Sequence, residues 1–598
     1  MIKKLMRVLE IVLTLLIGAV AVLVYRLVSW VFETWNSLSV EKLVYQLKAP
    51  MQGTNEEMVI DAVRYCCPYV ILGLLVIGAI FFLLRKKRWM HVFAAAVLVA
   101  SGTLMWSSLS RAEEELDIRD YVKNKGEYSG FIDGNYVDPK DVQITFPEKK
   151  RNLIYIYLES METTYADEAN GGGFSENYIP ELTRLAQENE DFSGNSEKLN
   201  GGYPMPDSTW TIAAMFAQSS GLPLSIPIEE NSMNTQQHFF PQVTALGDIL
   251  EEEGYSQTLL IGSDAVFGGR KLMYQEHGDF QIKDYDYALE QGWIPEGYKV
   301  WWGYEDGKLF EFAKQQLTEL AGQEEPFNLT LLTVDTHFED GWVCDLCEGQ
   351  FGDNQYGNVL ACSSRQVEAF VRWVQEQDFY EDTTIVLSGD HQTDDSDFCQ
   401  DVDEDYVRRV YTSYINSPVE AVQEDVWRDY TTFDQFPTTL AALGAEIEGN
   451  RLGLGTNLFS VELTLTEEYG REEMEEELLK RSRMMESLAE NIEVPEDSPE
   501  AAVEVQPYDG STGLIGVRVG DFEYLDAEIQ GVNIAVWIDG KEGEKKWGSA
   551  VRADDGSYYL NVDTAWFEGE KGDYQIEAYV RTADGGRYVL GTAEVSVE

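Results

Sequence analysis

Basic residues are scarce in this sequence. The 598-residue chain has 45 lysines and arginines against 105 aspartates and glutamates, which gives a formal net charge of −60. A protein that binds nucleic acid needs a basic surface to offset the phosphate backbone, so this composition argues against nucleic acid as a partner. The acidic residues are spread along the soluble part of the chain, which is typical of a solvated surface rather than of one acidic tail.

Histidine and cysteine are also few. There are five histidines in the whole chain, so a histidine that follows a predicted strand is informative. Of the six cysteines, Cys66 and Cys67 lie at the edge of an apolar run, and the other four are Cys344, Cys347, Cys362 and Cys399. A Cys-x-x-Cys pair can indicate zinc binding or redox chemistry. An oxidising compartment, for which the topology below argues, favours disulfides.

Long apolar runs are confined to the first 110 residues. They cover Ile11–Phe32, Tyr69–Leu84 and Val92–Trp106. Because crossing a bilayer core takes roughly 20 helical residues, the first run can span by itself and the other two need flanking residues. A cleaved signal peptide is the alternative for the first run, and the two runs that follow weigh against it. We expect residues 1–110 to form three transmembrane helices.

Two basic clusters predict how these helices are oriented. Lys3, Lys4 and Arg7 precede the first run, and Arg85–Arg88 separates the second run from the third. Basic segments next to membrane spans remain cytoplasmic. Three spans then place everything after about Ser110 outside the cell. We therefore expect a multi-pass protein of the cell membrane with an extracellular soluble part.

The soluble part begins with an α/β pattern. Residues 111–150 are polar and predict a connector with little regular structure. Residues 151–463 alternate short apolar strands with helical patterns, which predicts a doubly wound α/β domain. Strands are expected at 153–158, 258–261, 329–334 and 384–387, and helices at 179–189, 243–253, 307–321 and 364–376.

The pattern changes after residue 463. Residues 464–500 predict one helix, from Thr466 to Asn491, and then a linker that contains Pro495 and Pro499. Residues 501–598 show short alternating strands separated by Gly, Asp and Lys turns. They predict a small β-sandwich accessory domain without a catalytic cluster. Its strands are expected at 515–519, 532–538, 558–562, 574–580 and 594–597.

Polar residues follow the predicted strands where ligands gather in an open α/β sheet. Glu159 comes after the first strand, His337 after the third and Asp390-His391 after the fourth. Two carboxylates and an imidazole at equivalent strand ends suit a divalent ion such as Mn²⁺ or Zn²⁺. A helix cap, a turn or a satisfied polar end is the alternative for each residue alone. For His337 the alternatives are a contact with a phosphoryl group or leaving alkoxide, or a buried polar position.

A hydroxyl nucleophile is expected near a helix N-terminus. Ser208 and Thr209 precede a short predicted helix, Ile212–Gln218. Free helix N–H groups there favour anionic oxygen, although an ordinary N-cap is the alternative. Arg270 follows the strand that ends at Ile261 and can grip a phosphate bidentately, or it can be a surface arginine.

Six motifs in order resemble one known family. They are Asn152–Ser160 (NLIYIYLES), Thr209–Met215 (TWTIAAM) with Gly221–Leu224, Phe239–Pro241, Thr333–His337 (TVDTH), Ser388–His391 (SGDH) and Leu452–Gly455 (LGLG). The sequence resembles the phosphoglycerol transferases of the alkaline phosphatase/sulfatase superfamily over about residues 150–462. The enzymes that decorate periplasmic glucans are the better match, and lipoteichoic acid synthase is a more distant one.

The resemblance implies roles for the site residues. Glu159, Asp390 and His391, together with the nucleophile, would bind a divalent metal, with Mn²⁺ ahead of Zn²⁺ or Mg²⁺. Counting seven residues back from Met215, the family's spacing points to Ser208 as nucleophile, where the family usually has threonine. Thr209 is the neighbouring alternative. Arg270 and His337 would hold the glycerol phosphate. The Cys-x-Pro-Ser-Arg signature of sulfatases is absent, so sulfate ester hydrolysis is not expected.

The resemblance also implies substrates. Glycerol phosphate would pass from phosphatidylglycerol, through a covalent Ser/Thr intermediate, to an extracellular glycan or teichoic-acid-type polyol-phosphate acceptor. Phosphoethanolamine transfer, or a phosphodiesterase or sulfatase-type hydrolysis, is the alternative on the same fold. A catalytically inactive surface protein is a further alternative, against which the three potential metal ligands argue.

Two further expectations come from resemblance. Relatives that modify glucans carry cysteines at the positions of Cys347 and Cys362, which implies a 347–362 disulfide and leaves Cys344 and Cys399 as a second pair. Four thiols around a zinc ion are the alternative. The C-terminal domain resembles a small repeat of Gram-positive surface proteins, chiefly through Ile534–Trp537 and Asp555–Tyr558, which implies contact with the cell wall.

Overall fold

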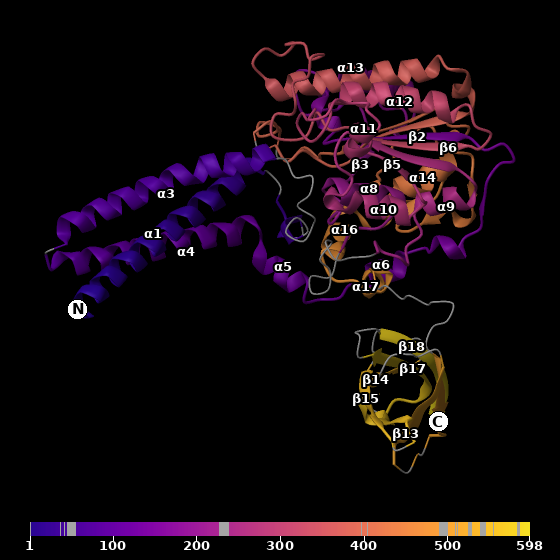
Figure 1. Cartoon of the computed structure of the whole chain (residues 1–598). Helices are drawn as coiled ribbons and strands as arrows, with labels where there is room; N and C mark the ends of the chain where they lie inside the picture. Colours follow the sequence, from indigo (N-terminus) through magenta and orange to yellow (C-terminus); the bar gives the residue numbers. More distant parts are fainter. Residues whose placement is uncertain are drawn as a thin grey trace. The chain divides into compact units, whose positions relative to one another are not determined.

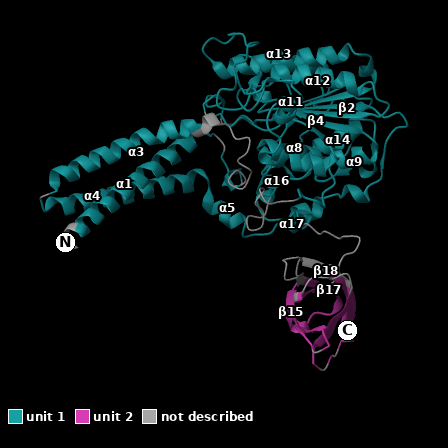
Figure 2. Cartoon of the chain, viewed as in Figure 1, with its two compact units in different colours: residues 1–489 teal, residues 490–598 magenta. Residues whose placement is uncertain are grey.

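The computed structural model describes most of the chain. The described residues are 2–35, 38–40, 42–44, 56–85, 87–225, 238–395, 397–403, 405–489, 500–508, 510, 512–523, 529–538, 546–553, 555–567, 569–582 and 587–597. The chain divides into two compact units, Met1–Ala489 and Glu490–Glu598 (Figure 2). Most of the predicted linker, including both of its prolines, lies outside the described residues.

Three long apolar helices form the N-terminal part of the first unit (Figure 1). They are α1 (Ile2–Thr34), α3 (Glu56–Leu84) and α4 (Trp89–Glu115), and each is long and apolar enough to cross a membrane. The beginnings of α1 and α4 lie side by side, because His91 Nδ1 is 2.8 Å from Glu10 Oε1. The predicted set of three apolar helices is thus confirmed.

A seven-stranded mixed sheet forms the centre of the soluble part of this unit. Its order is β3-β8-β7-β2-β6-β4-β5. The strands are β2 (Asn152–Leu158), β3 (Gly201–Gly202), β4 (Ser256–Ile261), β5 (Gln281–Lys283), β6 (Phe327–Leu332), β7 (Thr383–Gly389) and β8 (Val410–Ile415). The five strands from β7 to β5 are parallel, whereas β8 and β3 form an antiparallel edge. Four of the parallel strands, β2, β4, β6 and β7, were predicted from the sequence, whereas β5, β8 and β3 were missed.

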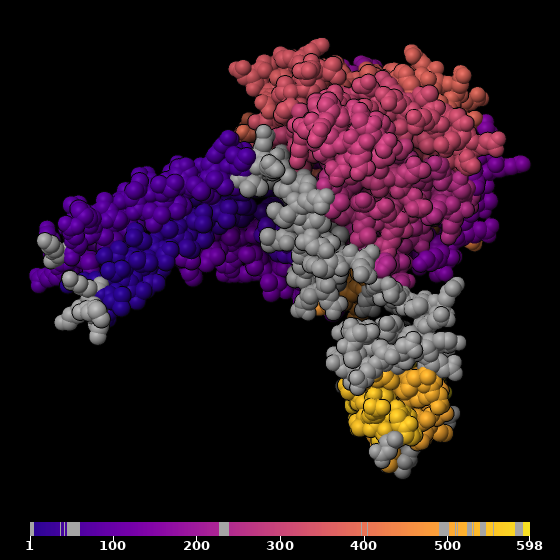
Figure 3. Space-filling view, viewed as in Figure 1, coloured from indigo at the N-terminus to yellow at the C-terminus, as the bar shows by residue number. Residues whose placement is uncertain are grey.

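Helices cover both faces of the sheet (Figure 1). Because side chains alternate along a strand, Ile154 and Ile156 of β2 face one core and Tyr155 and Tyr157 face the other. The first core is covered by α7 (Pro180–Glu188), α11 (Tyr285–Glu290), α12 (Asp306–Leu320) and α13 (Gln355–Gln375), and the last two lie at the surface in Figure 3. The second is covered by α8 (Thr211–Ser220), α9 (Leu246–Glu252), α10 (Arg270–Glu276) and α14 (Gln435–Ala442). This is the predicted doubly wound arrangement.

The segments that flank this domain are more structured than expected. The connector contains α5 (Ile118–Asn124), α6 (Phe131–Asn135) and the short strand β1 (Ile144–Thr145), which pairs with β9 (Glu446–Ile447). A second two-residue pair, β10 (Arg451–Leu452) with β11 (Gly455–Thr456), lies near the end of the domain.

The prediction of a single helix from Thr466 to Asn491 is wrong. Three short helices occupy this stretch, namely α15 (Leu465–Tyr469), α16 (Arg471–Leu478) and α17 (Arg483–Ala489). Gly470 separates the first two, because its φ of 84° and ψ of 151° are incompatible with a continuous helix. Met474, Leu478 and Met485 are buried against the domain core, so the segment is docked.

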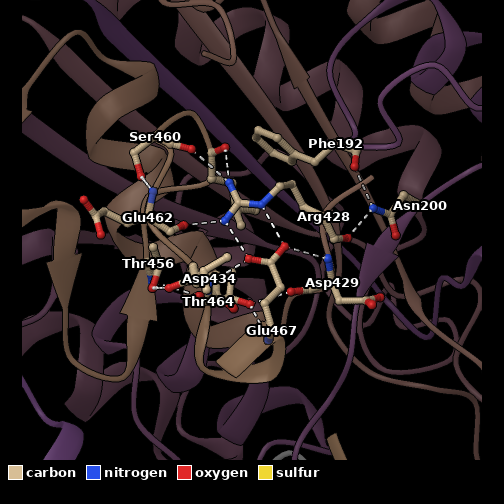
Figure 4. Close-up of polar contacts among 12 residues, drawn as sticks. Phe192, Asn200, Arg428, Asp429, Asp434, Thr456, Ser460, Glu462, Thr464 and Glu467 are labelled. Carbon is tan, nitrogen blue, oxygen red and sulfur yellow. Dashed lines mark hydrogen bonds and ion pairs between the residues drawn. The ribbon is translucent and has the colours of Figure 1, made fainter. Parts of the chain in front are cut away.

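One buried arginine holds the end of the domain in place (Figure 4). The Nε and Nη2 atoms of Arg428 donate to the two carboxylate oxygens of Glu467 at 2.9 and 3.0 Å. Its other donors reach the carbonyl oxygens of Leu458, Ser460 and Glu462. The residue is 5% exposed. A planar guanidinium can satisfy a carboxylate and three carbonyl groups at once, so Arg428 ties the turn before α15 to the domain.

The second unit is an antiparallel β domain. Its strand order is β12-β13-β16-β15-β14-β17-β18. The strands are β12 (Glu500–Val505), β13 (Leu514–Glu523), β14 (Ile529–Ile538), β15 (Lys546–Arg552), β16 (Tyr558–Asp563), β17 (Gly572–Thr582) and β18 (Arg587–Val597). The five predicted strands are present, and β12 and β15 were missed. Among the described residues their inward side chains form one apolar core.

Candidate active site

Three predicted site residues converge at the carboxyl end of the sheet. Glu159 directly follows β2, and Asp390 and His391 directly follow β7. These strands are parallel neighbours, and Leu158 pairs with Gly389, so the two carboxylates leave the sheet at the same level. One potential ligand atom from each of the three residues lies within 4.8 Å of the others, and all three side chains are buried.

The two carboxylates are poorly neutralised by the protein. Asp390 Oδ1 accepts the backbone N–H groups of Ser160 at 2.7 Å and His391 at 2.8 Å, whereas Oδ2 is buried without a hydrogen-bond partner. Burial raises the pKa of Asp390 to about 7. Burial also raises the pKa of Glu159, and the nearby Asp390 raises it further. A cation beside both groups would offset these effects.

The Nε2 atom of His391 points toward the same two carboxylates. Its Nδ1 lies 2.7 Å from the carbonyl oxygen of Gln392 and therefore carries the proton, which leaves a lone pair on Nε2. That Nε2 is 3.5 Å from Glu159 Oε1 and 3.4 Å from Asp390 Oδ2. A backbone contact that fixes the other ring nitrogen is typical of metal-ligating histidine. The oxygen and nitrogen donor set, with one orphaned oxygen, fits a divalent ion such as Mn²⁺ or Zn²⁺.

A threonine hydroxyl completes this cluster. Thr211 is the first residue of α8, and its Oγ1 lies 3.4 Å from Glu159 Oε2 and 3.4 Å from His391 Nε2. The first backbone N–H groups of a helix have no partner within the helix and attract anionic oxygen. The hydroxyl therefore combines three features of a phosphoryl-transfer nucleophile, which are a helix N-terminus, adjacent metal-type ligands and partial exposure.

The sequence comparisons agree with this geometry. Residues 151–445 match the family named Sulfatase, and residues 504–595 match the GBS Bsp-like repeat. Residues 151–445 form a sulfatase-family domain. The catalytic domain expected from the sequence thus matches the Sulfatase family, and the C-terminal antiparallel domain matches the repeat.

Individual relatives add detail. Phosphoglycerol transferase I of Escherichia coli strain 55989 / EAEC is 30% identical over 401 residues, which are 65% of this chain and 49% of that protein. The chain therefore spans about half the length of the curated relatives it matches.

Two solved structures are similar at lower identity. One is a protein of the alkaline phosphatase superfamily from Vibrio parahaemolyticus, with 16% identity, a TM-score of 0.42 and coverage of 72% of this chain and 88% of that one. The other is the lipoteichoic acid synthase LtaP from Listeria monocytogenes, with 19% identity, a TM-score of 0.38 and coverage of 54% and 79%. These likenesses are too distant to support a function.

Ser208 of the sulfatase-family domain does not have the contacts expected of the nucleophile or of a metal ligand. It is fully buried, and its Oγ donates to the carbonyl oxygen of Met205 at 2.6 Å. Thr209 is partly buried and precedes the helix by two residues. The hydroxyl within reach of Glu159 and His391 is that of Thr211, three residues after Ser208. The motif that contains Thr209 and Thr211 lies beside the three potential metal ligands, and the register chosen within it does not match the geometry.

Arg270 lies close to the same helix. It is the first residue of α10 and is 6% exposed. Its Nη2 donates to Asp264 O at 2.7 Å and its Nε to Phe267 O at 3.1 Å. The backbone turn before it packs on α8, since a Cβ on Gly268 would be 3.7 Å from Ile212 Cγ2. Arg270 is therefore held rigidly near the N-terminus of α8, as a phosphate-binding role requires.

His337 lies within electrostatic range of Glu159. Its Nδ1 lies 2.8 Å from Phe338 O, and its ring is 4.8 Å from that of Trp302. Burial lowers the pKa of His337, although the negative charge of Glu159 opposes this effect. The ring is therefore neutral near pH 7, with its lone pair on Nε2. This state can accept a proton.

The end of α1 contacts the loops that carry these residues. Just after α1, Trp35 packs edge-on against Phe338 with the ring centroids 5.7 Å apart, and it forms a backbone bridge with Asp395. Lys42 forms a buried ion pair with Asp394. The loops after β6 and β7 therefore lie at the end of a helix long enough to span a membrane.

The predicted disulfides are not formed. All six cysteines are free. Cys344, Cys347 and Cys362 lie together, with Sγ atoms within 4.8 Å of one another. Cys399 is buried in the core beneath α12 and α13, where burial and then the charge of Glu162 raise its pKa. The 344–399 assignment was wrong because the turn from Cys344 to Cys347 faces α13 and brings Cys344 to Cys362.

Proposed function

We propose that this protein is a membrane-anchored, divalent-metal-dependent phosphoglycerol transferase that uses Thr211 as its nucleophile. The position of the Thr211 hydroxyl carries this proposal, since it lies 3.4 Å from both Glu159 Oε2 and His391 Nε2 at the start of a helix. The similarity of the sulfatase-family domain to phosphoglycerol transferase I supports the class of group transferred.

Glu159, Asp390 and His391 are the residues that would hold the metal, with Mn²⁺ proposed ahead of Zn²⁺ or Mg²⁺. When bound, the ion lowers the pKa of an adjacent hydroxyl and offsets negative charge on the phosphoryl oxygens. Hydrogen bonds within the protein hold the two carboxylate residues in place. Thr333 Oγ1 accepts the N–H of Glu159 at 2.9 Å, and Ser160 N–H holds Asp390 at 2.7 Å.

In the first half-reaction, Thr211 Oγ1 attacks the phosphorus of phosphatidylglycerol. A bond forms between Oγ1 and phosphorus, and the bond from phosphorus to the diacylglycerol oxygen breaks. The threonine proton passes toward Glu159 Oε2 or His391 Nε2, which are the basic atoms beside it. It ends on the departing alkoxide of diacylglycerol. The free N–H groups at the start of α8, and Arg270 beside that helix, stabilise the charge on the phosphoryl oxygens.

In the second half-reaction, an acceptor hydroxyl attacks the same phosphorus, the bond from phosphorus to Thr211 Oγ1 breaks, and the acceptor's proton ends on Oγ1. A base must remove the acceptor's proton in this step. Neutral His337 is the residue we assign, because its Nε2 lone pair is free of the Phe338 contact made by Nδ1. The acceptor we propose is an extracellular glycan or polyol-phosphate chain, which the C-terminal domain would help to reach.

A lipid donor is supported by the position of α1. Contacts of Trp35 and Lys42 hold the loops of His337 and His391 at the end of that helix, so a headgroup at the bilayer surface is within reach. We propose that this surface is the outer one. The beginnings of α1 and α4 lie together, which puts the basic residues in the first turns of α1 and those between α3 and α4 at one end, as the positive-inside rule requires.

Mass spectrometry of the intact chain tests the proposal. The full-length protein in detergent is incubated with Mn²⁺ and phosphatidylglycerol, or with phosphatidylethanolamine in a parallel arm. We expect a glycerophosphoryl adduct on the peptide that contains Thr211. Thr211→Ala should abolish the adduct, Thr211→Ser should retain it, and Ser208→Ala and Thr209→Ala are the matched controls that should keep it.

Three results would contradict parts of this scheme. An adduct that survives Thr211→Ala and disappears in Ser208→Ala would overturn the nucleophile. An adduct only from phosphatidylethanolamine would overturn the donor and favour phosphoethanolamine transfer. Release of free glycerol phosphate beside diacylglycerol, without transfer to any added glycan or polyol-phosphate, would indicate a hydrolase.

A further inference from the structure

Three cysteines form a second cluster of potential metal ligands. Cys344 and Cys347 lie at the two ends of one turn, and Cys362 lies on α13. The Sγ atom of Cys344 is 3.7 Å from that of Cys347 and 3.7 Å from that of Cys362. All three sulfur atoms lie within 4.8 Å of one another. Cys344 and Cys362 are buried and Cys347 is partly exposed, so solvent reaches the cluster on one side.

These separations match a metal site better than a disulfide. Two sulfur ligands at about 2.3 Å from one tetrahedral zinc ion lie about 3.8 Å apart. Bonded sulfurs are about 2.05 Å apart. Two of three thiols can pair with each other, which would leave the third without a partner. A single ion with soft-ligand preference accounts for all three.

The surroundings of the sulfur atoms favour negative charge on Cys344, whereas the hydrogen bonds with Cys344 raise the pKa values of Cys347 and Cys362. The neighbouring Cys347 and Cys362 thiols lower the pKa of Cys344 through hydrogen bonds, and the backbone N–H groups of Leu346 and Cys347 lower it further. Gln366 Nε2 donates to Cys362 Sγ at 3.4 Å and lies 3.9 Å from Cys344 Sγ. Such N–H donors around thiolates are the outer contacts that orient metal ligands.

We propose that Cys344, Cys347 and Cys362 together bind one zinc ion through their thiolates, with water in the fourth position. Binding displaces the three thiol protons to solvent and involves no oxidation. The all-sulfur ligand set separates this site from the oxygen and nitrogen ligands of the candidate active site, so the inference does not depend on the proposed function.

Zinc bound by the three cysteines would hold the loop after β6 in place. This loop carries His337 and continues to Cys344, and the N–H of Trp342 donates to Asp335 O at 2.7 Å within it. An ion shared with Cys362 fastens the far end of the loop to α13. The zinc ion therefore acts as a brace for the segment that positions His337.

Metal analysis of the full-length chain tests this site. Zinc bound per chain is measured by mass spectrometry in three proteins that all carry His391→Ala, which removes a ligand of the other site. One has no cysteine change, one carries Cys362→Ser and one carries Cys399→Ser. Cys399 is the matched control, since it is a buried cysteine outside the cluster. We expect Cys362→Ser to lose one zinc equivalent and Cys399→Ser to lose none. With cobalt in place of zinc, a sulfur-to-metal charge-transfer band should appear and should vanish in Cys347→Ser.

A second measurement covers the case in which Cys362→Ser fails to fold. In the wild type, a strong chelator should make all three clustered cysteines react faster with an alkylating reagent and leave Cys399 unchanged. The proposal is overturned if peptide mapping without reductant finds a disulfide between any two of the three. It is also overturned if the chelator does not change their reactivity, or if Cys362→Ser binds as much zinc as Cys399→Ser.

Discussion

Replacing Asp390 with asparagine should stabilise the metal-free protein. Asparagine keeps an oxygen in the place of Oδ1, which accepts the backbone N–H groups of Ser160 and His391. It removes the negative charge from a fully buried carboxylate whose other oxygen has no hydrogen-bond partner. It also removes the repulsion that Asp390 exerts on Glu159. The buried negative charge of Asp390 is unfavourable when no cation lies beside it.

The pKa of Asp390 sets the size of the effect. In the folded protein this pKa is about 7, against an ordinary value of 3.8. Because each pKa unit corresponds to about 1.4 kcal/mol, ionised Asp390 costs the metal-free folded state about 4 kcal/mol. The sign follows from the raised pKa. The protonated carboxyl is favourable below pH 4, and this contribution is lost as the pH rises through 7.

Thermal unfolding of the full-length chain in detergent measures the effect. With chelator at pH 8, Asp390→Asn should unfold at a higher temperature than the wild type, and at pH 5 the difference should shrink. Saturating metal should reduce the difference in unfolding temperature between Asp390→Asn and the wild type at pH 8. Binding at 100 times the dissociation constant stabilises the wild type by about 2.7 kcal/mol. A variant less stable than the wild type in chelator at pH 8 would refute the reasoning, since the carboxylate would then be stabilised by the protein alone.

Three further predictions concern other parts of the chain. Arg428→Lys should lower stability by about 3 kcal/mol, because lysine cannot reach Glu467 and three carbonyl groups together; the unfolding midpoint measures it, with the partly exposed Arg471→Lys as control. His337→Gln should let the covalent adduct form but slow its transfer to an acceptor, so the adduct should accumulate in mass spectra, and an adduct that turns over at the wild-type rate would exclude His337 as the base. Protease added outside intact cells should cleave after Ser110, and cleavage restricted to inverted vesicles would reverse the proposed topology.

The metal-type ligands could be predicted from the sequence because parallel strands constrain their ends. The runs before Glu159 and Asp390 are nearly all apolar, which predicts strands buried on both faces. Neighbouring parallel strands deliver the residues that follow them to one edge of the sheet. The order of strands and the strands β3, β5 and β8 were not predictable in this way. β3 has only two residues, and its pairing with β8 depends on long-range packing.

The position of the Thr211 hydroxyl could not be predicted as well, because the start of α8 lacks the usual N-cap residue. Sequence rules place Ser or Thr at the N-cap, where the side chain accepts a hydrogen bond from the helix. In α8 the N-cap is Trp210, which makes no such capping bond. The hydroxyl of Thr211 lies inside the first turn and faces Glu159 and His391 instead. The helix start thus lacks its usual sequence signal, and the spacing counted back from Met215 selects Ser208, whose hydroxyl donates to Met205 O in the preceding turn.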